Sequence, residues 1–445
     1  MFSFRTFLAL PLLASLFCLP LGAHAAILEL ATAVDQAIKN SPVLQEAREK
    51  QEEYRFQASV SRATLFPQLD IGGNATRRKD AVANKLPAAL VFGGDSYNLY
   101  TLGATLDQPI LVWGALAAVR QAGIDYDVSA LEQDITARDL TRDVVAAYYR
   151  VVLYQNFINI NLEQEGVIKE ALNTARTRLG LGGRRLDLLQ VRTRLALIRP
   201  QIEKARNDLA AAAAELAKLM GDTSLANFEL RGTIPTLLYS NVEKSLNLKE
   251  FRLPELDKLR LARERLDEQR SIVLGKQLPS LRFKGDYTFT NYTKAELFDP
   301  SATSWSAQLV LSVPLFSGLS SIFERKAVNA QDRQLEAQER ETANSLGLAQ
   351  VRSRKVLDSA GASLGFAEEA AGLARESMTQ AARDYRFGQI DFLQYLQVQQ
   401  SNFEAVTSLS QWRYDNIVAL ADYFRASGQP LSTLVSTLNS LEAKR

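Results

Sequence analysis

Cysteine and histidine are almost absent from this chain, which has one of each, Cys18 and His24. Both lie in an N-terminal segment with the features of a secretory signal: Arg5 gives a positive start, an apolar run follows, and two alanines flank His24. We therefore predict a signal peptide over residues 1–25 and a mature chain that begins at Ala26.

A retained membrane anchor and a lipoprotein are the alternatives for this segment. An anchor is disfavoured because the apolar run is short and is interrupted by Pro11 and Pro20. Lipid attachment at Cys18 is disfavoured because the bulky Phe17 precedes it. Cleavage after Ala25 would leave a chain with neither a thiol nor an imidazole.

That loss excludes several kinds of active site together. Cysteine nucleophiles, disulfides, Ser-His-Asp triads, histidine acid–base chemistry and the usual zinc sites all need side chains that the mature sequence lacks. A hydrolase that uses a pair of carboxylates remains possible. We expect no enzyme activity, no cofactor and no bound metal.

Long apolar runs and a charge excess are also lacking. After residue 25, no stretch approaches the roughly 18–20 uncharged apolar residues of a membrane-spanning helix. Strands would therefore have to make any membrane crossing by the mature chain. The formal net charge is +2, so bulk electrostatics imply neither nucleic acid nor an anionic membrane surface as a partner.

What the chain does contain is an internal duplication. Helical patterns begin at Pro42 and Pro254 and end at Pro67 and Pro279, and each pair is 212 residues apart (254 − 42 = 279 − 67 = 212). The two copies then have related junctions between an alternating stretch and a very long helical one, Gln108-Pro109-Ile110-Leu111-Val112-Trp113-Gly114 and Val313-Pro314-Leu315-Phe316-Ser317-Gly318. Each copy reads helix, strand, strand, long helix, helix.

The duplication sets the boundaries that we predict. Arg120-Gln121-Ala122 matches Arg325-Lys326-Ala327 at an offset of 205 (325 − 120 = 205). The first copy covers residues 26–220, with a strand hairpin over 67–111 and a long helical hairpin over 114–220. The second covers 251–427, with the corresponding hairpins over 279–314 and 318–427. Residues 221–250 form an equatorial connector, and we expect the tail, 428–445, to be partly disordered.

Each predicted strand alternates between an apolar and a polar face. In the clearest case, Leu281, Phe283, Gly285, Tyr287 and Phe289 oppose Arg282, Lys284, Asp286, Thr288 and Thr290. This alternation over about 9–11 residues is typical of strands in a membrane barrel. Two soluble hairpins packed on a core are the alternative, but no further strand pattern exists to build a second sheet. We predict that the membrane-facing aromatics are Tyr100, Phe283, Tyr287, Phe289 and Trp305.

The long helical stretches favour coiled-coil packing. No proline occurs between Gly114 and Leu179, and apolar or small residues recur at spacings of three and four in both copies. At ~1.5 Å per residue each helix is roughly 100 Å long. Each ends in a glycine turn, at Gly182 or Gly388, before the chain reverses.

Four strands cannot close a barrel, and an open sheet in lipid leaves unsatisfied backbone groups at its edges. Assembly must therefore supply the missing strands. Two chains would give a narrow barrel of eight, whereas three would give twelve and an open lumen. We favour the trimer, which would also cover the apolar seams of the long helices.

On these features the chain resembles the TolC-like outer-membrane efflux family over essentially its whole mature length. The most specific residues are the junction Val313 to Gly318, its weaker partner Pro109 to Gly114, and the two glycine turns. The resemblance implies an α+β membrane protein: a trimer with a twelve-stranded barrel in the outer membrane and an α-helical tunnel through the periplasm. It also implies docking, through the helical tips, to a periplasmic adaptor and an inner-membrane pump.

The tunnel entrance is where the resemblance and the sequence differ. Family members often carry acidic residues six and nine positions after the second tip glycine, and here these positions are Gln394 and Gln397 (388 + 6 and 388 + 9). We predict a neutral ring, because amides satisfy one another as donors and acceptors. The predicted gate comprises Asp187, Asp391, Gln394, Gln397, Arg184 and Arg185, and the predicted tip turns and adaptor contacts are Gly182, Gly388, Leu181 and Phe387.

The leading functional prediction is a passive exit duct of a tripartite efflux pump or a type I secretion system, with energy supplied by the partner pump. Its expected contacts are two further copies of itself, the adaptor, the pump and outer-membrane lipid. A periplasmic coiled-coil adaptor or scaffold is the alternative, but it would need β-rich domains that the sequence does not predict. A secreted carboxylate-pair hydrolase is opposed by the predominance of coiled coil.

Overall fold

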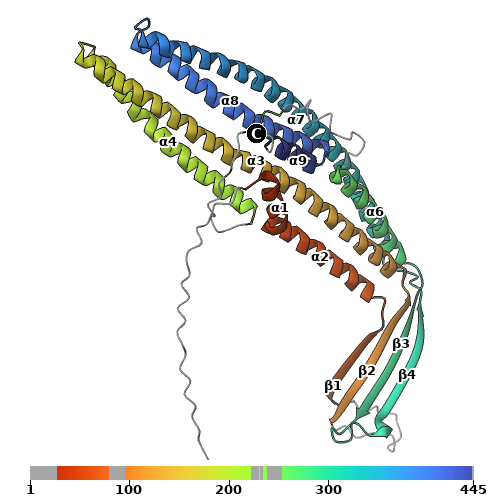
Figure 1. Ribbon diagram of the computed structural model, residues 1–445. Coiled ribbons are helices and arrows are strands. Elements are labelled where there is room, and N and C mark those ends of the chain that lie inside the picture. Colours follow the sequence, from red (N-terminus) through yellow and green to blue (C-terminus); the bar gives the residue numbers. More distant parts are fainter. Residues whose placement is uncertain (1–27, 80–95, 222–229, 231–233, 238–252, 443–445) are drawn as a thin grey trace, which may run out of the picture.

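The computed structural model describes residues 28–79, 96–221, 230, 234–237 and 253–442. The predicted signal peptide and most of the predicted connector lie outside these residues. Figure 1 shows a four-stranded sheet at one end and a long, curved arm of helices extending from it. The α+β class with long helical hairpins is therefore confirmed.

The sheet is antiparallel, with its strands in sequence order: β1 (Gln68–Arg78), β2 (Tyr97–Leu111), β3 (Ser280–Asn291) and β4 (Thr303–Ser312). Its register places the alternating faces of all four strands in phase. Ile71, Ala104, Tyr287 and Trp305 form one cross-strand row, and Asp70, Thr105, Asp286 and Ser306 form the adjacent row on the opposite face. Since neighbouring residues of a strand point to opposite faces, the sheet has one mainly apolar and one polar face.

Helices continue from the strands in the same order. α1 (Leu30–Asn40) ends before the break at Ser41, and α2 (Pro42–Ala63) has its proline in the first turn, where the missing N–H costs nothing. α2, α3 (Trp113–Gly180), α6 (Pro254–Gly275) and α7 (Ser320–Arg386) pack side by side, each on the next. α4 (Arg185–Leu219) pairs with α3, and α8 (Phe392–Ser427) pairs with α7, forming two long hairpins. Within the described residues, no helix is both long and apolar enough to cross a membrane.

A glycine pair brings the two repeats together where the helices join the sheet. A Cβ atom at Gly275, the last residue of α6, would lie 2.5 Å from the backbone nitrogen of Gly114 at the start of α3. No side chain fits in that space. The absence of a side chain at Gly275 is therefore what lets the two backbones meet at this point.

The main hydrophobic core lies midway along the arm, between α1, α3, α8 and the C-terminal helix. Tyr148 and Tyr149 of α3 are fully buried there, with their rings edge to face at 5.3 Å between centroids. Leu30 of α1 and Phe424 of α8 are also fully buried in this cluster. Residues from both ends of the described chain thus share one core.

The tail, for which we predict partial disorder, is helical in its described part. Residues Leu431–Glu442 form α9, in which Leu434 and Leu438 are fully buried. The backbone N–H of Ala31 in α1 donates to Oδ1 of Asn439 at 3.3 Å. Spacing of the leucines at 431, 434 and 438 gives α9 an apolar face, and that face packs into the main core.

Candidate functional site

The two helical tips lie at the end of the arm farthest from the sheet (Figure 1). Gly182 and Gly388 have φ values of +93° and +76°, in the left-handed region that favours glycine, so both turns need this residue type. Leu181 and Phe387 precede them and are 84% and 79% exposed. Each tip therefore presents a large apolar side chain to its surroundings.

Asp391 and Gln394 form a reciprocal cap at the start of α8. The backbone N–H of Gln394 donates to Oδ1 of Asp391 at 2.8 Å, and the N–H of Asp391 donates to Oε1 of Gln394 at 3.3 Å. This is a capping box, which satisfies two backbone donors that a helix start leaves without partners. Two predicted gate residues thus have a local structural role, and this cap does not use the amide NH2 of Gln394.

An arginine on α3 links the first hairpin to the second. Arg178 donates from Nη2 to the backbone oxygen of Tyr385 at 2.9 Å, and its guanidinium lies 4.2 Å from the centre of the Tyr385 ring. Tyr385 in turn stacks on Tyr395 of α8, with ring centroids 4.8 Å apart. Burial raises the pKa of Tyr385 above its usual value, an effect that the charge of Arg178 opposes and that of Asp187 reinforces.

The predicted gate residues of the first tip pair with each other. Nη2 of Arg184 lies 3.4 Å from Oδ1 of Asp187, one helical turn on. Arg185 and Gln397 are exposed. Among the described residues, no ion pair joins the predicted gate residues across the two tips. The described residues also contain no group of three or more His, Cys, Asp or Glu side chains that could hold a metal ion.

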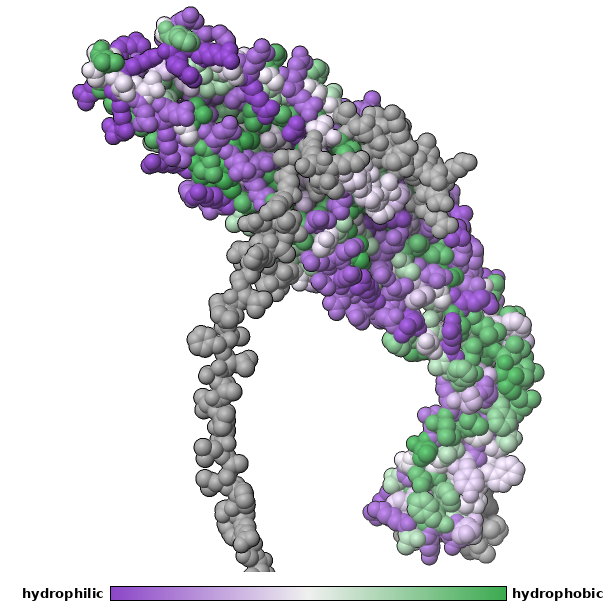
Figure 2. Space-filling view, viewed as in Figure 1, coloured by the Kyte–Doolittle hydropathy of each residue, from purple (hydrophilic) through white to green (hydrophobic). Residues whose placement is uncertain are grey.

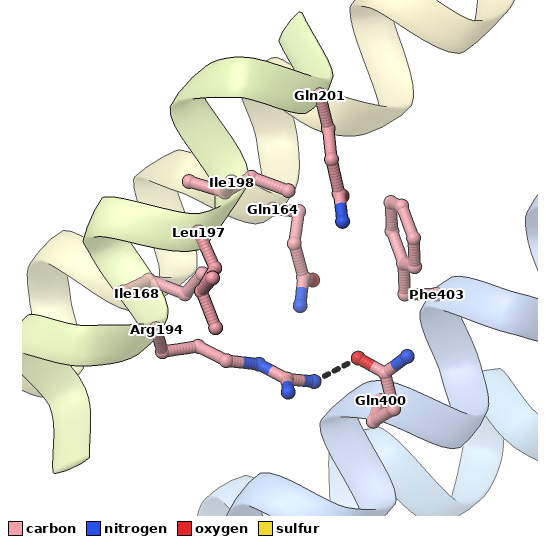
Figure 3. A pocket seen from close by; sticks show the side chains of 8 residues that line it. All are labelled: Gln164, Ile168, Arg194, Leu197, Ile198, Gln201, Gln400 and Phe403. Atoms are coloured by element: carbon pink, nitrogen blue, oxygen red, sulfur yellow. Dashed lines mark hydrogen bonds between the residues drawn. The ribbon is translucent and has the colours of Figure 1, made fainter.

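A polar seam separates the two hairpins between the tips and the main core. A cavity of about 150 Å³ lies in this seam. Figure 3 shows Arg194 of α4 reaching across it to hydrogen-bond Gln400 of α8. Gln164 and Gln201 point into the same space from α3 and α4. A second cavity of about 270 Å³ adjoins it through the shared residues Gln164 and Phe403. Both are large enough for water.

Gln399 lies in the wall of the second cavity, and its side chain is only 1% exposed. Within the described part of the chain, neither its Oε1 nor its Nε2 has a hydrogen-bond partner. Burial of an amide without a hydrogen-bond partner is costly, so Gln399 is the residue of this seam whose substitution is most informative. The sequence pattern did not identify Gln399, because a polar residue between two helices does not reveal whether its side chain has a hydrogen-bond partner.

The five predicted membrane-facing aromatics share one face of the sheet. Tyr287 pairs with Trp305 across β3 and β4, Phe283 pairs with Leu309, and Tyr100 lies in register with Asn291, two residues beyond Phe289. Trp305, Leu309 and Ile71 on this face are 76%, 64% and 76% exposed. Figure 2 shows the strand end of the molecule as predominantly hydrophobic and the helical arm as predominantly hydrophilic. Such an exposed apolar band on a sheet marks an interaction surface.

Several solved structures have the same overall fold as this chain. The outer membrane protein VceC of Vibrio cholerae superposes with a TM-score of 0.75 at 16% identity, covering 90% of this chain and 96% of that one. The CusC structure gives a TM-score of 0.75 at 16% identity, with 90% and 92% covered. These similarities show a shared fold.

Sequence comparison extends the likeness to curated proteins. The alkaline protease secretion protein AprF of Pseudomonas aeruginosa is 25% identical over 401 residues, which cover 86% of this chain and 81% of AprF. Protein CyaE of Bordetella pertussis is 23% identical over 348 residues, 76% of this chain and 70% of CyaE. The outer membrane efflux protein profile matches residues 33–222 and 250–429, most of both repeats. This chain therefore belongs to the outer membrane efflux protein family.

Proposed function

We propose that three copies of this chain form a passive exit duct in the outer membrane, serving a tripartite efflux pump or a type I secretion system. The observation that carries this proposal is the sheet, whose apolar face is continuous over four strands and backed by a polar face. β1 and β4 each have one neighbouring strand within the chain. Closure of three such sheets gives twelve strands, with lipid outside and a polar lumen inside.

The helical arm supports the same closure. α2 and α7 flank the layer α2-α3-α6-α7, directly beyond the edge strands β1 and β4. Three arms side by side would continue the barrel as a tunnel, about as long as the 68-residue α3, which at ~1.5 Å per residue is roughly 100 Å. The walls of such a duct catalyse nothing and bind no cofactor or nucleic acid.

The tips are the proposed docking sites for a periplasmic adaptor, which connects the duct to an inner-membrane pump. Exposed Leu181 and Phe387 would provide apolar contacts there. AprF, by its name, serves secretion of an alkaline protease, which supports a secretion partner. The pump would supply the energy for transport through this passive duct.

The proposed gate is a neutral ring at the second tip. Gln397 is exposed on α8, and the NH2 group of Gln394 is left available by the cap. Three copies would bring these amides around a common axis, with Asp391, Asp187 and Arg184 or Arg185 between the tips. Adaptor binding opens the gate when it offers the tips better contacts than they make with one another.

The test is to extract the protein from outer membranes, measure its mass in detergent and record its conductance in planar bilayers. We expect a trimer with low resting conductance and weak block by divalent cations. Gln397→Ala should raise the resting conductance. Gln389→Ala should not, because Gln389 is exposed in the tip turn before α8, outside the proposed ring. A soluble periplasmic monomer would indicate the adaptor or scaffold instead. Tight divalent block that Asp391→Asn abolishes would replace the amide ring with an acidic one.

A further inference from the structure

The loop between β3 and β4, residues 292–302, lies at the end of the sheet farthest from the helical arm (Figure 1). Outer membrane efflux proteins extend their helices into the periplasm, so this loop lies on the cell-surface side of the membrane. The structure describes every residue of the loop. Its side chains can therefore be placed relative to the two faces of the sheet.

Hydrogen bonds within the loop give it a defined shape. Nδ2 of Asn291 donates to the backbone oxygen of Glu296 at 2.8 Å, and Oγ1 of Thr293 donates to Oε2 of Glu296 at 2.9 Å. Oδ1 of Asp299 accepts from the backbone N–H of Ser301 at 2.8 Å. Glu296 and Asp299 are the two acidic residues of the loop, so both of its carboxylates are engaged inside it.

The loop folds over the apolar face of the sheet. The ring of Phe298 packs edge to face on Phe289, with centroids 5.5 Å apart, and Phe289 packs in the same way on Tyr287 at 5.3 Å. Nζ of Lys294 lies 5.4 Å from the centre of the Tyr100 ring. Phe289, Tyr287 and Tyr100 are among the predicted membrane-facing aromatics. The loop thus adds one more ring and an ammonium group to that face.

Both contacts are made on the two inner strands of the sheet. Tyr100 belongs to β2 and Phe289 to β3, and each of these strands has a neighbour on both sides within the chain. A second copy of the chain would join the sheet at β1 or β4 instead. Lys294 is exposed and Phe298 is 66% exposed. Their exposure therefore lies on the outward face of the sheet, where lipid would be.

Lys294 is left with donors to offer. Within the described residues, its ammonium group contacts the Tyr100 ring and no carboxylate. A lysine above an aromatic ring keeps three N–H donors, and its apolar stem can lie along the face while the charge reaches the headgroup level. Lysines in this position attract the phosphates of anionic lipids. The rings beside it offer an apolar surface to an acyl chain.

We infer that Lys294, Phe298, Phe289 and Tyr100 form a lipid-binding corner for the phosphorylated glycolipid of the outer leaflet. Its phosphate is bound by Lys294, and an acyl chain lies against the aromatic rings. The glycolipid is the expected ligand because the corner is at the cell-surface end of the sheet, whereas phospholipid fills the periplasmic leaflet. This inference rests on the proposed duct, whose sheet lies in the membrane, and it names one lipid partner of that sheet.

Native mass spectrometry of the protein, extracted from outer membranes and freed of lipid by detergent exchange, tests the corner. Three probes are titrated: diphosphoryl lipid A, the same lipid A without its phosphates, and phosphatidylglycerol. Diphosphoryl lipid A should bind about fivefold more tightly than its dephosphorylated form, the contribution of one lysine near an anionic headgroup. Equal binding of these two would overturn the inference. Phosphatidylglycerol that bound as tightly as lipid A would overturn the assignment to the glycolipid.

Two lysine variants show whether the corner is responsible. Lys294→Gln should remove the fivefold preference for phosphate. Lys284→Gln is the matched control, because Lys284 is exposed on the same strand pair but lies on its polar face, opposite Gln308. Its preference should stay at the native value. Loss of preference in both variants, or in neither, would contradict a site at the corner.

The role of Phe298 is tested separately, because its ring seats the loop on the sheet. Phe298→Ala should weaken the binding of diphosphoryl lipid A, and Phe298→Tyr, which keeps a ring, should restore it. Neither change should alter single-channel conductance. A conducting trimer without any preference for the phosphorylated lipid would overturn the corner and leave the duct intact. A protein absent from the outer membrane would remove both proposals together.

Discussion

At the scale of single residues, the sequence predicts features that depend on neighbouring positions, but it does not predict contacts between residues that are far apart in the chain. The Asp391-x-x-Gln394 sequence before a helix has the form of a capping box, and that signal could have assigned both side chains to a cap. Arg178 and Tyr385 are 207 positions apart, and a contact between hairpins depends on a tertiary register that spacing along one helix does not specify. The strand aromatics were placed correctly on one face because alternation is a local property.

Gln399 offers a test of the polar seam at this scale. Gln399→Leu keeps a similar volume and removes two unpaired polar atoms from a site that is 1% exposed. We expect it to raise the free energy of unfolding by about 1–3 kcal/mol, measured by thermal or urea unfolding. Gln400→Leu is the matched control and should destabilise, because it deprives Arg194 of its acceptor. Destabilisation by Gln399→Leu would instead mean that ordered water satisfies this amide.

At the scale of elements, the helices and strands follow from strong periodicity and clear breaks, such as Pro42 and the tip glycines. α9 could not be predicted in the same way, because Gly428 and Pro430 signal the end of a helix and the apolar spacing of the twelve residues after them is short. The sequence pattern does not predict which helices pack on one another, just as it does not predict the contacts between the two hairpins. The clearest case is Glu132 of α3, which receives Lys50 of α2 at 2.8 Å and Lys258 of α6 at 2.6 Å.

This bridge predicts a pH dependence. Burial alone would raise the pKa of Glu132, but hydrogen bonds from Lys258 and Lys50 bring it below the usual value of 4.5. A lowered pKa in the folded state stabilises the fold above that usual value, and the contribution is lost as pH falls through the lowered pKa. Glu132→Gln should therefore cost about 0.5–2 kcal/mol at pH 7, in urea unfolding, and progressively less below pH 4.5.

Glu336→Gln provides the comparison. Glu336 makes a long pair of 3.8 Å with Arg340 on its own helix, and both side chains are well exposed. Its replacement should change stability by less than about 0.5 kcal/mol at either pH. If the two variants behaved alike, Glu132 would be an ordinary surface residue.

At the scale of the whole molecule, the two-faced sheet determines where a charge is tolerated. Leu309→Arg places a cation on the apolar face, and in a bilayer it should cost about 2–4 kcal/mol near the midplane. Ser306→Arg, on the polar face of the same strand, should be accepted. Folding into lipid vesicles under a urea gradient measures both. Equal costs would show that the faces have been assigned wrongly.

The shared core of α1 and α9 has a consequence for the order of events when the protein is made. Leu30 and Leu434 are packed in one cluster, so its two halves leave the ribosome and enter the periplasm at opposite ends of synthesis. The first repeat can form its local helices early, but its central contacts wait for the last dozen described residues. Until then apolar surface stays open to chaperones and proteases. The core of the arm is therefore complete only after the C-terminal helix has been delivered.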